Sequence, residues 1–192
     1  MVLRGFAFLS LIIVLLGCSA SPAEPAPAAP SPAAPAPAAP SAAFSTTDVA
    51  WLQLADALHT RALPLLELAP ERSASPPLVE LAGRLGTAHG TTGRSRLRAL
   101  LAQARVTGEN PHVQHDMPGM PTADDLRELG TLRKADFDRR FVTLLRAYLD
   151  QLVLVAKGEQ SAGGAAEVRG LAAAMAGAHA AELAELDRVA AR

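Results

Sequence analysis

Apolar residues recur at helical spacing along most of the chain after Phe44, and no run alternates between apolar and polar positions as a half-buried strand would. The first helix is predicted to begin near Ser45–Asp48, where hydroxyl and carboxylate side chains can cap free backbone N–H groups. Pro64 lies late in this pattern and predicts a kink or an early end near Leu63. The apolar face of this helix consists of Trp51, Leu54, Leu58, Ala62 and Leu65.

A second helix is predicted from about Leu78 to Ala104, and it contains a face of glycines. Because each glycine costs about 1 kcal/mol relative to alanine inside a helix, we expect this face to allow the close approach of a neighbouring helix. The alternative is that the Gly90–Gly93 run breaks the helix. The face consists of Gly83, Gly86, Gly90 and Gly93, and the equivalent positions near the end of the chain hold Ala173, Ala176, Ala180 and Leu183.

Three further helices are predicted in the second half of the chain. Thr122–Asp125 can cap a short helix that ends near Leu132, and a long helix begins near Ala135. Gly158 and the Ser161–Gly164 run predict the turn before a last helix. That helix spans about 165–190 and has one apolar stripe of Val168, Ala172, Met175, His179, Leu183 and Leu186.

The chain contains an internal duplication with an offset of 90 residues, which places Trp51 on Phe141 and His89 on His179. We interpret residues 44–192 as one domain in which two helical hairpins, at about 45–104 and 135–191, flank a connector at about 105–134. Four long helices in two hairpins predict an all-α fold, an antiparallel four-helix bundle.

The first 43 residues predict that the protein is exported and anchored to a membrane. Residues 1–17 begin with Arg4 and continue with an apolar run, which is typical of a secretory signal and shorter than the ~20 residues of a membrane span. The run ends in Leu-Leu-Gly-Cys18, which resembles a bacterial lipobox, so Cys18 is predicted to be lipidated; a cleaved signal with an incidental cysteine is the alternative. Residues 19–43 are almost entirely Ala, Pro and Ser and predict a disordered, extended stalk. We expect an exported protein, anchored by lipid to the outer face of the cell membrane or envelope.

Charge and motifs exclude several classes of function. The formal net charge is −1 and the charges are mixed along the chain, so no basic stripe predicts binding to nucleic acid. The sequence lacks G-x-S-x-G and a phosphate-binding glycine loop, and its only cysteine adjoins the signal. We therefore expect a protein that is not an enzyme.

The segment Pro111–Met120 in the middle of the chain, hereafter the His/Met segment, carries one set of candidate metal ligands. Imidazole together with thioether sulfur suits copper, because methionine favours Cu(I) and imidazole suits Cu(II). The alternative is a polar loop whose methionines cap one end of the bundle. The candidate ligands are His112, His115, Met117 and Met120.

Three other histidines, His59, His89 and His179, are predicted to point into the bundle and form a second candidate set. Asp56-x-x-His59 and His179-x-x-Glu182 place a carboxylate three residues from a histidine, as metal sites in helical bundles do. The alternative is that each buried imidazole is neutral and hydrogen-bonded within the core.

Over roughly residues 44–189 the chain resembles the bacterial domain of unknown function 305 family. The resemblance rests on Asp48 and Trp51, on the His115–Met120 run, on Phe137–Phe141 and on Ala181-Glu182-Leu183. It implies an exported protein with a ferritin-like four-helix fold, and some members of the family are associated with copper.

The family has a Met-Met-x-Pro-His-His run in its first and third helices, and this chain departs from it. Leu54–His59 and Leu144–Leu149 stand at these places, so His59 is the one histidine of the two runs that is retained. His89 and His179 stand where the family usually has glutamine. The resemblance therefore implies either a member that has lost metal binding or one that has rebuilt a sparser site from the three interior histidines.

Together these features predict a non-enzymatic envelope lipoprotein that binds copper or another transition metal weakly. The alternative is a structural or protein-interaction module of the envelope that has lost metal binding, and the sequence does not identify its protein partner. A metal-dependent oxidoreductase would need a complete set of metal ligands that these residues do not supply.

Overall fold

In the computed structural model, which describes residues 44–191, helix α1 (Thr46–Glu67) begins at the predicted cap. Ser45 and Asp48 form a capping box, in which the side chain of each accepts a hydrogen bond from the backbone N–H of the other. The helix continues through Pro64 to Glu67, so an early end near Leu63 is not found. Pro64 is exposed, and the buried leucines that follow it hold the last turn in place. The four-residue helix α2 (Ala69–Arg72) comes next.

The second long helical stretch consists of α3 (Pro76–Thr87), the π-helical turn η1 (Ala88–Gly93) and α4 (Arg94–Gln103). The glycine run therefore does not break the helix. It changes the backbone hydrogen bonds locally from the α-helical pattern to the wider π-helical pattern. The prediction that a neighbouring helix approaches the glycine face closely is wrong at Gly83 and Gly86, where an added Cβ would meet nothing within 4 Å. It holds at Gly90, whose Cβ would lie 2.8 Å from the Leu63 side chain. The corresponding small residues of the last helix, Ala173 and Ala180, are exposed as well.

The second half of the chain forms α5 (Ala123–Thr131), α6 (Lys134–Ala162) and α7 (Ala166–Ala190). Helix α6 runs through Gly158, and the turn comes only at Gly163, so the prediction that Gly158 makes the turn is wrong. The inner face of α6 continues past Gly158 with the buried Glu159, and this burial extends the helix despite the low helix propensity of glycine.

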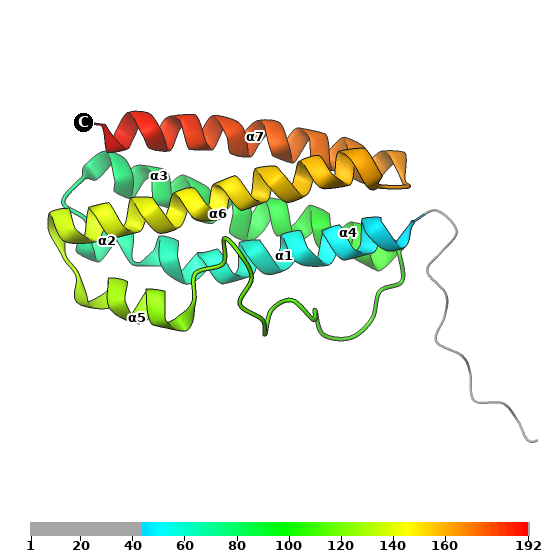
Figure 1. Cartoon of the computed structure of the whole chain (residues 1–192), viewed down its shortest axis with the longest axis horizontal. Coiled ribbons are helices and arrows are strands. Elements are labelled where there is room, and N and C mark those ends of the chain that lie inside the picture. Colours follow the sequence, from blue (N-terminus) through cyan, green and yellow to red (C-terminus); the bar gives the residue numbers. More distant parts are fainter. Residues whose placement is uncertain (1–43, 192) are drawn as a thin grey trace, which may run out of the picture. The chain divides into compact units, whose positions relative to one another are not determined.

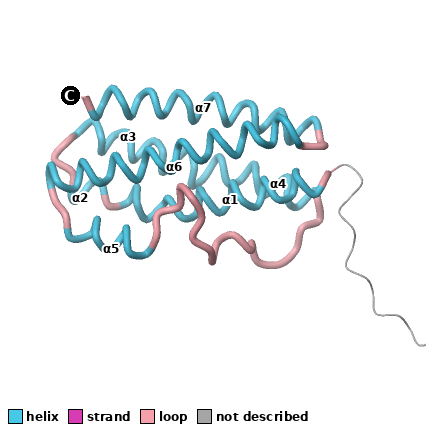
Figure 2. The backbone as a smooth tube through the Cα atoms, in the orientation of Figure 1, coloured by secondary structure: helices cyan, strands magenta, loops and turns pink. Residues whose placement is uncertain are grey.

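These elements build an antiparallel bundle of two hairpins (Figures 1 and 2). In the first hairpin α1 packs against α3 and α4, and in the second α6 packs against α7. The hairpins meet where α6 contacts α1 and α7 contacts α3. The structure confirms the predicted all-α bundle of four long helical stretches. Among residues 44–191, none of the helices combines the length and the apolar character that a membrane span requires. The predicted signal, Cys18 and the stalk lie outside the described residues.

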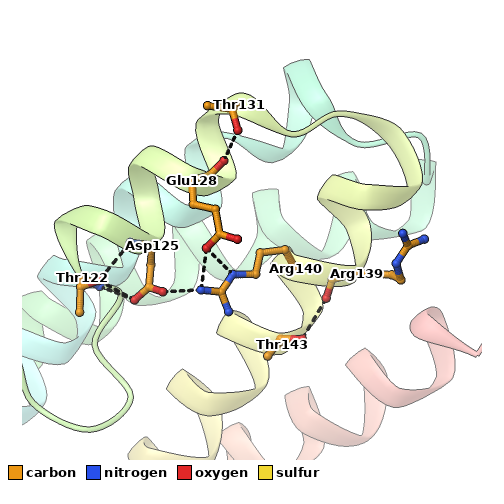
Figure 3. Close-up of polar contacts among 7 residues, drawn as sticks. All are labelled: Thr122, Asp125, Glu128, Thr131, Arg139, Arg140 and Thr143. Carbon is orange, nitrogen blue, oxygen red and sulfur yellow. Dashed lines mark hydrogen bonds and ion pairs between the residues drawn. The ribbon is translucent and has the colours of Figure 1, made fainter.

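Helix α5 closes the connector onto the second hairpin through a small polar network, which Figure 3 shows. Thr122 and Asp125 form the predicted cap of α5 as a second capping box. The Arg140 guanidinium on α6 donates to Asp125 Oδ1 at 2.6 Å and to Glu128 Oε2 at 3.1 Å. One arginine thus fixes both turns of α5 to α6, and with them the end of the His/Met segment.

The buried apolar residues form two clusters, and polar side chains lie between them along the bundle. In the second helical stretch the buried His89 comes between Leu85 of one cluster and Leu97 of the other. His179 takes the equivalent place in α7. The bundle therefore has a polar layer in its interior, and this layer contains the candidate site.

Candidate metal centre

Three histidines that are far apart in the sequence meet in this polar layer. His59 comes from α1, His89 from η1 and His179 from α7, and their exposed fractions are 0%, 3% and 4%. The ring centroids of His59 and His89 lie 4.7 Å apart, those of His89 and His179 5.0 Å, and those of His59 and His179 5.7 Å. The structure thus brings together all three histidines that the sequence predicted to point inward.

Two further side chains connect the three imidazoles. The Tyr148 hydroxyl on α6 lies 2.8 Å from His59 Nδ1 and 2.8 Å from His89 Nδ1. The Glu182 carboxylate on α7 lies 3.1 Å from His89 Nε2 and 2.8 Å from His179 Nδ1. We call these five residues the interior histidine cluster. Its members come from all four long helical stretches of the bundle.

The sequence predicts the three histidines as site residues, but neither Tyr148 nor Glu182. For Glu182 the signal was the three-residue spacing from His179, which places both side chains on one face of α7. Tyr148 is the only tyrosine of the chain, and it lies with the buried Phe141 and Leu152 in one apolar stripe of α6. A buried tyrosine hydroxyl requires a hydrogen-bonding partner, so its position in that stripe was an available signal.

Burial sets the charge states within the cluster. Burial and the neighbouring charges of His89, His179 and Arg94 lower the pKa of His59 well below its ordinary value, so this imidazole is neutral. Burial, with the charge of Glu182, raises the pKa of Tyr148 well above its ordinary value. Burial alone would raise the pKa of Glu182, but hydrogen bonds from His179 and His89 outweigh it and lower the pKa to about 2. Glu182 is therefore an ionised carboxylate in the interior.

Two imidazole nitrogens of the cluster have no partner. His59 Nε2 and His179 Nε2 are fully buried and make no hydrogen bond. In the same cluster, ligand atoms of His89, His179 and Glu182 all lie within 4.8 Å of one another. Imidazole nitrogen and carboxylate oxygen are common ligands of zinc and copper. The cluster therefore offers the donor chemistry of a transition-metal site.

Asp56, three residues before His59, does not hydrogen-bond to that imidazole. The Asp56 carboxylate instead accepts hydrogen bonds from Arg94 Nε at 3.1 Å and from Arg98 Nε at 3.2 Å. The two arginines are one helical turn apart on α4, which packs against α1, so both reach the same carboxylate. Asp56 thus ties α1 to α4, beside the cluster.

The His/Met segment places its candidate ligands in different surroundings. Met120 is 5% exposed and belongs to the apolar core, and Met117 packs against that core. His115 is exposed and His112 half-buried. The two sulfur atoms therefore face the bundle, as the capping alternative expects, while one of the two imidazoles faces solvent.

Backbone contacts hold this segment against the bundle. Arg61 of α1 donates to the Val113 carbonyl at 3.1 Å and to the Pro121 carbonyl at 3.0 Å. Gly119 has φ of 80°, and an added Cβ would lie 2.9 Å from the Ala147 carbonyl oxygen of α6. Glycine is required at this position because both the dihedral angle and the close approach exclude a side chain.

Comparison with known proteins identifies the fold and the family. The model of a domain of unknown function, DUF305, matches residues 48–190. A DUF305 fragment from Deinococcus radiodurans has a similar structure, with a TM-score of 0.68 at 20% identity over 78% of this chain and 98% of that one. A DUF305 protein of Streptomyces coelicolor that is described as secreted matches with a TM-score of 0.62 at 20% identity, over 73% of this chain and 89% of that one.

A third similar structure is that of CopM in its Cu(I)-bound form, with a TM-score of 0.60 at 18% identity over 75% of this chain and 95% of that one. CopM in its Cu(II)-bound form matches as well, with a TM-score of 0.62 at 20% identity, over 73% of this chain and 93% of that one. A search of curated protein sequences finds no match to this chain. Since the family model covers most of the chain, the protein belongs to the DUF305 family.

Proposed function

We propose that this protein is a non-enzymatic, exported and lipid-anchored member of the DUF305 family that binds a transition metal ion inside its helical bundle. The observation that carries the proposal is the pair of buried, unpartnered imidazole nitrogens in the interior histidine cluster. A buried polar atom without a partner destabilises a protein by about 1–3 kcal/mol. A ligand that both nitrogens can bind accounts for keeping two such atoms in one cluster.

Copper is the first ion to consider, because CopM carries copper in both of its similar structures. The interior histidine cluster provides imidazole nitrogen donors, which suit Cu(II) and Zn(II). Cu(I) prefers thioether sulfur, but Met120 and Met117 of the His/Met segment pack on the core instead. The residues therefore fit a divalent ion at the interior histidine cluster better than Cu(I) at the His/Met segment.

The burial of the interior histidine cluster favours binding of a metal ion over catalytic turnover of an organic substrate. Glu182 is the most exposed member of the cluster, and its side chain is 19% exposed. An ion can reach such a layer when the helices move slightly apart, whereas an organic substrate would require them to separate. A bound ion would be held by imidazole nitrogens, and its role would be storage or transfer of the metal.

A purely structural role is the second candidate, and the hydrogen bonds of the cluster favour it. Tyr148 and Glu182 join all four long helical stretches and pair most of the polar atoms in the layer. In that case the cluster specifies the register of the bundle, and the protein serves as an interaction module of the envelope.

Metal titration of the purified full-length protein in detergent distinguishes these functions. We expect one Cu(II) or Zn(II) ion per chain after dialysis and elemental analysis, and nitrogen hyperfine splitting in the electron paramagnetic resonance spectrum of the copper form. If the protein retains neither ion, the metal-binding proposal is wrong and the structural role stands.

The lipid anchor has a separate test. Cells that express the protein are labelled with a radioactive fatty acid, and the label should appear in the wild type and be absent from the Cys18→Ala variant. Equal labelling of both proteins, or of neither, would rule out lipidation at Cys18.

A further inference from the structure

The Glu182 carboxylate lies within hydrogen-bonding distance of one nitrogen of His89 and one nitrogen of His179, and this geometry determines where the protons of both rings lie. A carboxylate has no proton to donate, so both nitrogens that face it must carry one. His89 therefore donates from Nε2 and His179 donates from Nδ1. A histidine that binds a metal ion through one ring nitrogen carries its proton on the other, so the nitrogen of His179 that can bind an ion is Nε2.

The two hydrogen bonds of Tyr148 extend this proton assignment to His59. With its proton on Nε2, His89 offers an acceptor at Nδ1 to the Tyr148 hydroxyl, which has one proton to donate. The tyrosine oxygen then accepts from His59, which must carry its proton on Nδ1. Since Nδ1 of His59 carries the proton, a metal ion can bind this ring only at the unpartnered Nε2. Both unpartnered nitrogens of the cluster are thus acceptors, as metal ligands must be.

The π-helical turn leaves space beside one of these lone pairs. Gly93 ends the turn, and a Cβ added there would lie 3.6 Å from His59 Nε2 and 3.2 Å from the Ala88 carbonyl oxygen. The missing side chain of Gly93 therefore leaves room at this nitrogen for an atom. Wide turns of this kind occur frequently at functional sites, and here the turn also carries His89.

We propose that a divalent, imidazole-preferring transition metal ion binds to His59 Nε2 in the space that Gly93 leaves, with His179 Nε2 as its second protein ligand. In this arrangement Glu182, His89 and Tyr148 do not bind the ion but hold both ligands in the required tautomer. Such outer hydrogen bonds orient metal-binding histidines, and their loss typically weakens metal binding 10–100-fold. The inference rests on the proposed function and names the atoms that perform it.

Two glycine variants test whether the ion binds in the space beside His59 Nε2. Gly93→Ala adds one methyl group beside His59 Nε2 and leaves every cluster residue in place, while Gly86→Ala adds the same group where nothing lies within 4 Å. In titrations with Zn(II) and Cu(II), we expect Gly93→Ala to lose binding and Gly86→Ala to bind like the wild type. Circular dichroism melting of each variant confirms that it is folded.

A second variant keeps the test valid if Gly93→Ala does not fold. Tyr148→Phe removes only the hydroxyl that fixes His59, so we expect metal affinity to fall 10–100-fold. If the wild type binds metal and either folded variant binds it with unchanged affinity, the assignment to His59 and its hydrogen-bond chain is overturned while the proposed function stands. If the wild type binds no ion, both are overturned.

Nitrogen-15 spectra of the metal-free protein test the tautomers directly. We expect the proton on Nδ1 in His59 and His179 and on Nε2 in His89. A proton on His59 Nε2 would place a donor where the ion must bind and would contradict the inference, even if the protein binds metal elsewhere.

Discussion

The two histidine-bearing regions of this protein differ in how their side chains are brought together. The His/Met segment holds its four candidate ligands within nine residues, but Met120 is buried in the core, Met117 packs against it, and His115 is exposed to solvent. In the interior histidine cluster, Tyr148 contacts His59, which lies 89 residues away in the sequence, and His89, which lies 59 residues away. Packed helices can fix the direction of distant side chains, whereas a short loop follows its own apolar contacts. Proximity in sequence is therefore the weaker guide to a metal site here.

Truncation of Met120 should have the largest effect on stability. Its side chain is buried in the apolar core, so Met120→Ala should lower the free energy of unfolding by about 3 kcal/mol, as for other buried methionines. His115→Ala, in the same segment but exposed, should change it by less than about 0.5 kcal/mol. Urea unfolding followed by circular dichroism measures both. Equal and small effects would mean that the methionines do not hold the segment to the bundle.

Removal of the Tyr148 hydroxyl should have the next largest effect. In Tyr148→Phe both His59 Nδ1 and His89 Nδ1 lose their partner, and we expect a loss of about 2 kcal/mol in metal-free protein. The phenylalanine ring fills the same space, so packing is retained. Unchanged stability would show that the hydroxyl bridge contributes nothing to the bundle.

Glu159 provides a contrast within the interior, because it is buried without belonging to the cluster. Burial, together with the charge of the Asp48 carboxylate, raises its pKa from 4.5 to about 8. The folded state thus binds an extra proton between these values, so the stability that Glu159 contributes is present below about pH 4.5 and is lost as the pH rises through 8.

Replacement by the neutral isostere should remove this pH dependence. We expect Glu159→Gln to equal the wild type near pH 4.5 and to exceed it by about 1–2 kcal/mol near pH 8.5. Thermal melting across this pH range measures the difference. If both proteins lose stability in parallel as the pH rises, then another group titrates there.

The smallest expected effect comes from the glycine face. Because the site of an added Cβ at Gly86 is open, Gly86→Ala should raise the free energy of unfolding by about 0.5–1 kcal/mol through better helix propensity. A decrease in melting temperature would instead indicate a close neighbour at this position.

The sequence predicted most of the architecture because helices are encoded locally. The capping residues Ser45 and Thr122 and the apolar stripes gave helix starts within a few residues of those found. The ends were harder, since packing carries α1 past Pro64 and α6 past Gly158. Local preference for a helix end was overcome by buried residues farther along the same face.

The candidate site was only partly predictable. The offset of the duplication placed His89 and His179 at equivalent core positions, and helical periodicity turned His59 inward. The bridging role of Tyr148 depends on the register of α6 against α1 and η1, which no local pattern encodes. The space at Gly93 depends on a π-helical turn that a glycine run does not distinguish from a helix break.

Metal binding by two double variants tests the central claim most directly. His59→Leu with His179→Leu replaces both free imidazole nitrogens by apolar groups, and Met117→Leu with Met120→Leu replaces both sulfur atoms at nearly constant volume. Each purified full-length variant is titrated with Cu(II) and Zn(II) beside the wild type, after circular dichroism has confirmed its fold. The account predicts that the histidine variant loses the ion and the methionine variant keeps it with unchanged affinity. Loss of the ion from the methionine variant, with retention by the histidine variant, would contradict it.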